Sequence, residues 1–223
     1  RHALASLGYD AALITCTAIA DTDWVRATQA LYEPICVSSR LAIVPTWHDP
    51  LDNVINLRLD PGVAFGTGSH PTTRLCLQWL DDHVQPTMRV LDYGTGSGIL
   101  AIAALLLGAA EACGVDIDPQ AVEAAQYNAT LNAVSPRFSG TEAVPDLDPD
   151  ILIANILTKP LIMLEPLFAR LVQPGRRLAL TGILAEQAVE VTDAYMAHFD
   201  LAPWRQSEGW TLLTGIRHDR GME

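Results

Sequence analysis

Residues Val90 to Leu100 read VLDYGTGSGIL, and this segment is the strongest indication of the fold class. Its apolar run leads into three alternating glycines, which allow a tight turn where a ligand can touch backbone, and an apolar segment typical of a helix follows. Residues 114–119 read GVDIDP, a second apolar run that ends in carboxylates. Because an acidic side chain about 20 residues after such a turn can bind both hydroxyls of a ribose, the two stretches predict an adenosyl cofactor.

The spacing of the glycines separates two classes of cofactor. A nicotinamide or flavin dinucleotide site needs the order G-x-G-x-x-G, whose third glycine lets the helix pack close to the strand. Here Gly94, Gly96 and Gly98 alternate, and Ile99 stands where that third glycine is needed. Asp92, just before the turn, would repel a pyrophosphate but suits a cationic amino-acid group, reached directly or through water. S-adenosylmethionine carries an ammonium and a sulfonium, so the sequence predicts this cofactor rather than NAD.

The composition bounds the class of protein. At 223 residues, of which 49% are hydrophobic, the chain is long enough for one sizeable core and a small appendage. No apolar run approaches the roughly 20 residues that span a bilayer. The chain opens on Arg1 without a charged and then apolar leader, so we expect a trimmed fragment of a cytoplasmic protein. The net charge of −12 disfavours unaided binding to nucleic acid and suits a basic protein partner.

The cysteines and histidines do not predict a metal site. The cysteines form no C-x-x-C pair and have no histidine cluster nearby, which argues against zinc and against a disulfide framework. Most of the histidines lack carboxylate or cysteine partners at ligand spacing. We therefore expect no metal ion in this protein.

From residue 89 onwards, strand patterns alternate with helix patterns, which is typical of β/α units around a parallel sheet. We predict seven strands, at residues 89–92, 112–117, 137–141, 151–154, 177–181, 201–206 and 210–216, the last two as an antiparallel hairpin around Glu208-Gly209. We predict helices at residues 71–80, 99–107, 119–131, 160–172, where Pro166 kinks or splits the helix, and 184–199. The expected fold is a seven-stranded Rossmann-like α/β fold.

The segment before residue 89 is less regular. Residues 1–45 are short mixed segments with a strand-like run at Ile35 to Val44, and Val54 to Leu59 reads as another strand. Residues 64–73, AFGTGSHPTT, then form a glycine-rich loop that is a candidate lid. Its last residues supply a cap and a first-turn proline for the helix that follows.

Asn155 is the predicted acceptor site. Methyl transfer from a sulfonium is an in-line displacement, so an enzyme mainly aligns the donor carbon with the acceptor lone pair and excludes water. Asn155 follows the buried strand 151–154, at the edge where open α/β sheets bind ligands. Its side chain can accept a hydrogen bond from a neutral amine and aim that lone pair. Asparagine also often ends a strand and begins a helix, so a purely structural cap remains an alternative.

Four other side chains are candidates for the same site. Asp116 could cap the next helix instead of binding a ribose, but Asp118 already stands in the capping position. Phe65 lies in the glycine-rich loop, where an aromatic ring could cover the cofactor, and Thr73 lies just after it, where a hydroxyl could reach the polar end of the cofactor. His70 could act as a base for an incoming ammonium or could simply cap the helix.

These stretches resemble one known family, the PrmA methyltransferases, which modify amino groups of the large-subunit ribosomal protein number eleven. The resemblance runs from about Trp24 to the end of the chain, and the H-P-T-T loop joined to the N-I-L motif is far more specific than the glycine turn. The matching stretches are residues 60–73, 91–100, 114–119, 154–157 (ANIL) and 181–184 (TGIL).

The resemblance implies a class I S-adenosylmethionine-dependent methyltransferase, acting on lysine side chains or the N-terminus of that ribosomal protein. It implies cofactor contact at Thr73, Gly94, Asp116 and Asn155, with Phe65 over the methionine end. Family members carry an N-terminal recognition domain, so residues 1–45 would be its remnant and the linker, and residues 46–223 the catalytic domain.

Three other functions remain open at this point. A methyltransferase for a small molecule or another protein would keep the fold and change the acceptor. A scaffold that binds the cofactor without turnover, or a nicotinamide oxidoreductase, would change the class. A nucleic-acid amine is disfavoured as acceptor, because Ile156 and Leu157 are aliphatic where an aromatic ring would stack a flipped base.

Overall fold

The computed structural model describes residues 32–60, 68–144 and 146–219. The chain divides into two compact units, residues 1–32 and residues 33–223. Apart from Tyr32, the first unit lies outside the described residues, and so does most of the glycine-rich loop. The description below therefore concerns the second unit.

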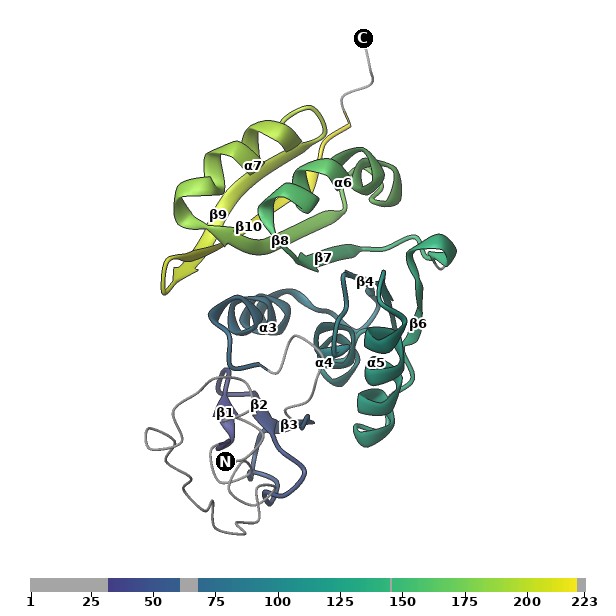
Figure 1. The fold of residues 1–223 in the computed structure, drawn as a ribbon, viewed down its shortest axis with the longest axis vertical. Coiled ribbons are helices and arrows are strands. Elements are labelled where there is room, and N and C mark those ends of the chain that lie inside the picture. Colours follow the sequence, from purple (N-terminus) through teal and green to yellow (C-terminus); the bar gives the residue numbers. More distant parts are fainter. Residues whose placement is uncertain (1–31, 61–67, 145, 220–223) are drawn as a thin grey trace, which may run out of the picture. The chain divides into compact units, whose positions relative to one another are not determined.

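A seven-stranded sheet forms the centre of this unit (Figure 1), in the order β6-β5-β4-β7-β8-β10-β9. Neighbouring strands from β6 to β8 are parallel, whereas β10 is antiparallel to both β8 and β9. The predicted Rossmann-like α/β fold with seven strands is confirmed. The strands are β4 (Arg89–Tyr93), β5 (Glu111–Asp116), β6 (Arg137–Gly140), β7 (Ile151–Asn155), β8 (Arg177–Leu184), β9 (Phe199–Ser207) and β10 (Trp210–Arg217).

Most buried positions of the central strands are apolar, because helices cover both faces of the sheet. In β7, Ile151 and Ile153 belong to one buried cluster, and the alternating Leu152 and Ala154 belong to the other. Figure 1 shows α3, α4 and α5 on one side of the sheet and α6 and α7 on the other. These helices are α3 (Pro71–His83), α4 (Ile99–Leu106), α5 (Pro119–Leu131), α6 (Thr158–Leu171) and α7 (Ala188–Tyr195).

Two of the predicted helix starts are confirmed by capping contacts. His70 is the N-cap of α3, where its Nδ1 accepts a hydrogen bond of 3.3 Å from the Thr72 backbone N–H. Asp118 is the N-cap of α5, where its Oδ1 accepts a hydrogen bond of 2.9 Å from the Gln120 backbone N–H. In both helices proline follows the cap, where its missing N–H costs no helical hydrogen bond.

Two other helix predictions are wrong in part. The helix expected over residues 184–199 is shorter, because Leu184 ends β8 and the buried Phe199 begins β9. A short 3-10 turn (Ala185–Gln187) precedes α7. The helix expected to kink or split at Pro166 is not split, since α6 runs through this exposed proline, whereas a kink stays a prediction.

A three-stranded sheet, β1-β2-β3, precedes α3 and consists of β1 (Ile35–Cys36), β2 (Leu41–Val44) and β3 (Ile55–Arg58). The single strand expected at residues 35–44 is an antiparallel hairpin instead, because the Ser38 hydroxyl accepts hydrogen bonds from the Arg40 and Leu41 backbone N–H groups and turns the chain. Leu41 and Ile43 belong to the same buried cluster as the residues of α3 and α4. The domain boundary expected at residue 45 stays a prediction.

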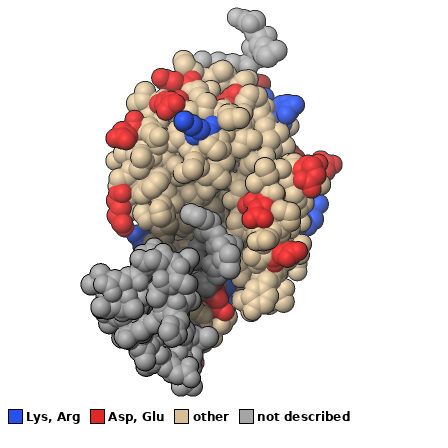
Figure 2. All heavy atoms as spheres, viewed as in Figure 1, with Lys and Arg blue, Asp and Glu red and all other residues tan. Residues whose placement is uncertain are grey.

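The face visible in Figure 2 matches the acidic composition of the chain. Figure 2 shows acidic side chains spread over the visible face, with few basic side chains between them. Among the described residues, no helix is long and apolar enough to cross a membrane.

Candidate functional site

Three of the predicted site segments meet at one edge of the sheet. Gly94 follows β4, Asp116 ends β5 and Asn155 ends β7. Strand β4 lies between the other two, with Tyr93 paired to Val115 in β5 and to Ala154 in β7. Because all three strands are parallel, their carboxyl ends share an edge. The order of the strands in the sheet reverses between β4 and β7, and open α/β sheets bind ligands at such a point.

The turn after β4 needs its glycines. Gly94, Gly96 and Gly98 have φ values of +77°, +54° and +80°, a region that other residues rarely adopt. A Cβ on Gly94 would lie 2.5 Å from Cγ2 of Ile156, and one on Gly98 would lie 2.8 Å from Cβ of Ala125. Gly98 therefore allows close packing here, whereas in a dinucleotide site the glycine with this role would stand one position later, at residue 99.

Asp116 connects the glycine turn to the end of β5. Its Oδ2 accepts a hydrogen bond of 2.8 Å from the Gly96 backbone N–H, and its Oδ1 accepts one of 3.0 Å from the Asp118 backbone N–H. The side chain is partly exposed, and each carboxylate oxygen has a second acceptor position. Because Asp118 caps α5, the helix-cap alternative for Asp116 is wrong.

Asp92 lies beneath the turn and is completely buried. Its Oδ2 accepts hydrogen bonds from the Thr95 hydroxyl, at 2.6 Å, and from the Ala101 backbone N–H, at 3.3 Å. Its Oδ1 is buried without a hydrogen-bond partner among the described residues. Burial raises the pKa of Asp92 from 3.8 to about 7; the two hydrogen bonds lower the pKa and the nearby charge of Asp116 raises it. A buried, unpartnered carboxylate oxygen is costly, and a bound cation would relieve that cost.

Asn155 contacts Thr73 across 82 residues of sequence: its Nδ2 donates a hydrogen bond of 3.4 Å to the Thr73 hydroxyl. Thr73 lies in the first turn of α3 and is 1% exposed, whereas Asn155 is partly exposed at the end of β7. The alternative role for Asn155, as a cap of the next helix, is wrong because the N-cap of α6 is Leu157. The amide is therefore available to a ligand at the sheet edge.

The remaining candidates have different outcomes. Phe65 lies outside the described residues, so its expected position over the cofactor stays a prediction. His70 caps α3, and its Nδ1 also lies 2.7 Å from the Thr72 hydroxyl. Within the described ranges, no three His, Cys, Asp or Glu side chains gather where they could hold a metal ion.

Gly182 is a site residue to which the sequence analysis gave no role. It lies inside β8 with a φ of +87°, and a Cβ there would lie 2.1 Å from the Ile156 carbonyl oxygen. The pairing of β10 with β8 also shifts register opposite this position, between Thr211 and Leu213. A glycine inside a strand often marks such a bulge or close backbone approach, so the T-G-I-L motif contained the signal.

We predict that Gly182→Ala lowers the free energy of unfolding by about 2 kcal/mol and displaces the residue after Asn155, since both the φ and the contact oppose a side chain. Gly175→Ala is the matched control: its φ is +81°, but no atom of the described residues lies within 4 Å of a Cβ there. It should cost only about 1 kcal/mol. Urea unfolding measures both, and equal losses would contradict the close approach.

The comparisons with known proteins agree with this geometry. Residues 2–218 match the family model described as ribosomal protein L11 methyltransferase (PrmA). The chain is 57% identical over 200 residues to the ribosomal protein L11 methyltransferase of Chromobacterium violaceum, covering 89% of this chain and 67% of that protein. It is 53% identical over 212 residues to that of Laribacter hongkongensis, covering 94% and 71%.

A solved structure also resembles this one. The crystal structure of a ribosomal protein L11 methylase from Lactobacillus delbrueckii subsp. bulgaricus has a TM-score of 0.76 and 34% sequence identity, covering 84% of this chain and all of that one.

Proposed function

Because the chain belongs to the ribosomal protein L11 methyltransferase (PrmA) family, we propose that it transfers methyl groups from S-adenosylmethionine to amino groups of the large-subunit ribosomal protein L11. The observation that carries the proposal is the buried Asp92, whose Oδ1 lacks a partner among the described residues beneath a glycine turn. We also propose that the reaction takes place in the cytoplasm, and that residues 1–45 belong to a recognition domain and linker and residues 46–223 to the catalytic domain.

The residues at the sheet edge fit S-adenosylmethionine, which when bound supplies a methyl group on a positively charged sulfur. Asp92 is suited to the ammonium of its amino-acid part, because a carboxylate with a vacant acceptor position is buried there. Asp116 is suited to the ribose hydroxyls, held in place by the Gly96 N–H. Gly94 and Gly96 carry no side chains of their own, so a ligand can approach their backbone. We also propose that Thr73 and Phe65 lie at the methionine end of the cofactor.

Asn155 is the residue proposed to orient the acceptor amine. Its Nδ2 donates a hydrogen bond to the Thr73 hydroxyl, and its Oδ1 is the atom of the amide that can accept a hydrogen bond from an amine. With one N–H of the amine held in that hydrogen bond, the lone pair of the amine nitrogen can point at the methyl carbon for in-line attack. No side chain has to form a covalent bond, so positioning is the main contribution of the protein.

The direct test is mass spectrometry of purified ribosomal protein L11 after incubation with the chain and S-adenosylmethionine. We expect peptides of the ribosomal protein that carry added methyl groups, on lysine side chains or on the N-terminal amine. A parallel reaction uses a whole-cell extract and tritiated donor. The proposed acceptor would be contradicted if other molecules of the extract carried tritium while ribosomal protein L11 stayed unmethylated.

Asp116→Ala is expected to weaken binding of S-adenosylmethionine by about 1–3 kcal/mol, because a hydrogen bond to a charged group is lost. Isothermal titration calorimetry measures the affinity. Asp118→Ala is the matched control, since it removes a carboxylate two residues away that caps α5. It should lower the free energy of unfolding by about 1 kcal/mol and leave the affinity for S-adenosylmethionine unchanged. Unchanged affinity in Asp116→Ala would refute the ribose assignment.

A further inference from the structure

The turn between β9 and β10 carries an unexpected residue. Glu208 and Gly209 both have positive φ values, +51° and +80°, as in a two-residue hairpin turn of type I′. Such turns favour Asn, Asp or Gly at the first position, because other side chains are strained there. A glutamate at this position calls for a reason outside the turn.

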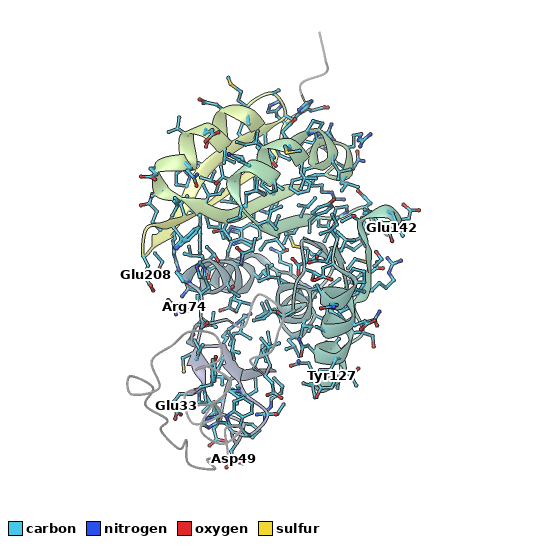
Figure 3. All side chains as sticks on the ribbon, viewed as in Figure 1. Glu33, Asp49, Arg74, Tyr127, Glu142 and Glu208 are labelled. Atoms are coloured by element: carbon cyan, nitrogen blue, oxygen red, sulfur yellow. The ribbon has the colours of Figure 1, made fainter. Side chains whose placement is uncertain are left out.

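The reason is a contact with the start of α3. Glu208 Oε1 accepts a hydrogen bond of 2.6 Å from Nη2 of Arg74, and Nη1 of Arg74 donates one of 3.0 Å to the Ser69 carbonyl. Figure 3 shows Arg74 and Glu208 close together, one from α3 and the other from the hairpin tip. The guanidinium therefore joins the hairpin to the residue that precedes the N-cap of α3.

A second contact joins the same two segments. The rings of His70 and Trp210 meet edge to face, with their centroids 5.0 Å apart and their planes at 69°. His70 is the N-cap of α3, and Trp210 is the first residue of β10. We call the Arg74–Glu208 ion pair and the His70–Trp210 ring contact together the α3 clasp.

The α3 clasp acts on the part of α3 that touches the proposed site. The first turn of this helix contains Thr73, whose hydroxyl lies 3.4 Å from Nδ2 of Asn155, close to the longest separation at which a hydrogen bond forms. A small displacement of the first turn would break this bond and release the amide. The later turns do not need the clasp, since Leu77, Trp79 and Leu80 are completely buried.

We propose that Glu208 and Trp210 are positioning residues for methyl transfer: they hold the first turn of α3 so that Thr73 keeps the Asn155 amide in its acceptor-binding orientation. This inference rests on the proposed function. It assigns a role in the reaction to a hairpin tip that contributes no group to the site itself.

Glu208→Asn separates this role from the needs of the turn, because asparagine adopts a positive φ more readily than glutamate. We expect thermal stability at or above that of the unaltered chain, with kcat for ribosomal protein L11 about tenfold lower and Kd for S-adenosylmethionine changed less than about twofold. Trp210→Leu should lower kcat in the same way. An unchanged kcat in Glu208→Asn would overturn the proposal.

A charge exchange tests the ion pair directly. Arg74→Glu and Glu208→Arg should each lower kcat, and the double variant should recover part of the loss because opposite charges face each other again. The control is the same exchange at Arg40 and Asp81, an ion pair of 2.9 Å that joins the β1–β2 turn to the far half of α3, and it should leave kcat unchanged. A double variant no better than the single ones would count against the clasp.

Amide hydrogen exchange gives a readout that needs no methyl transfer. The backbone N–H groups of Thr73 and Arg74 donate to the His70 carbonyl at 3.1 and 3.2 Å, and they should exchange faster in Glu208→Asn. If the unaltered chain methylates nothing, the proposed function fails and this measurement still decides on the clasp. Unchanged exchange in an active enzyme overturns the clasp alone.

Discussion

Replacing Asn155 by alanine should lower kcat for methylation of ribosomal protein L11 about 100-fold, while Kd for S-adenosylmethionine changes less than about threefold. The reason is that orienting the acceptor lone pair contributes to the transition state and little to binding of the donor. Steady-state kinetics with the purified ribosomal protein gives kcat, and calorimetry gives the affinity. Equal losses in both would make Asn155 a cofactor contact only.

The control for this variant removes a similar amide elsewhere. Asn56 is partly buried in β3, and within the described part of the chain its side chain hydrogen-bonds to backbone groups at Leu51 and Val54. Asn56→Ala should therefore cost stability, by about 1–3 kcal/mol, and leave kcat unchanged. Thr73→Val gives an intermediate case: it removes the hydroxyl that holds the Asn155 amide, and we expect a loss of about tenfold in kcat.

The second large effect concerns the charge of Asp92. Its folded-state pKa of about 7 lies above the unfolded value of 3.8, so the unfolded chain binds fewer protons between these pH values. Stability of the chain without cofactor should therefore fall as pH rises from about 4 to about 7, by about 4 kcal/mol from this group, and then level off. Asp92→Asn removes this dependence and should be the more stable protein at pH 8.

The same substitution should weaken binding of S-adenosylmethionine by about 2 kcal/mol, because the carboxylate that would face the ammonium is gone. In the unaltered chain the affinity should fall as pH drops below about 7, since Asp92 must lose its proton to attract a cation. Urea unfolding and calorimetry across this pH range measure both effects. Asp82→Asn, which changes an exposed carboxylate, should show neither. Gained stability with unchanged affinity would mean that Asp92 does not face the ammonium.

The elements that could be predicted from sequence have strong local patterns. The buried strand 151–154 and the capped helix that begins at Pro119 both appear in the structure. Where prediction failed, the local pattern had two readings. Leu184 and Phe199 were expected at the two ends of a helix, but Leu184 ends β8 and the buried Phe199 begins β9. Ser38 turns a run of strand-forming residues into a hairpin.

The groups that reach the carboxyl edge of the sheet follow from the amino-acid sequence alone. Strand ends follow from local hydrophobic patterns, and parallel β/α units place those ends together, so Gly94, Asp116 and Asn155 were expected in one place. The charge and the contacts of these groups depend instead on the packing of the folded chain. Burial sets the charge of Asp92, and contacts such as that of Asn155 with Thr73 join segments far apart in the chain. Such effects depend on distances of a few ångströms between elements, which no local pattern encodes.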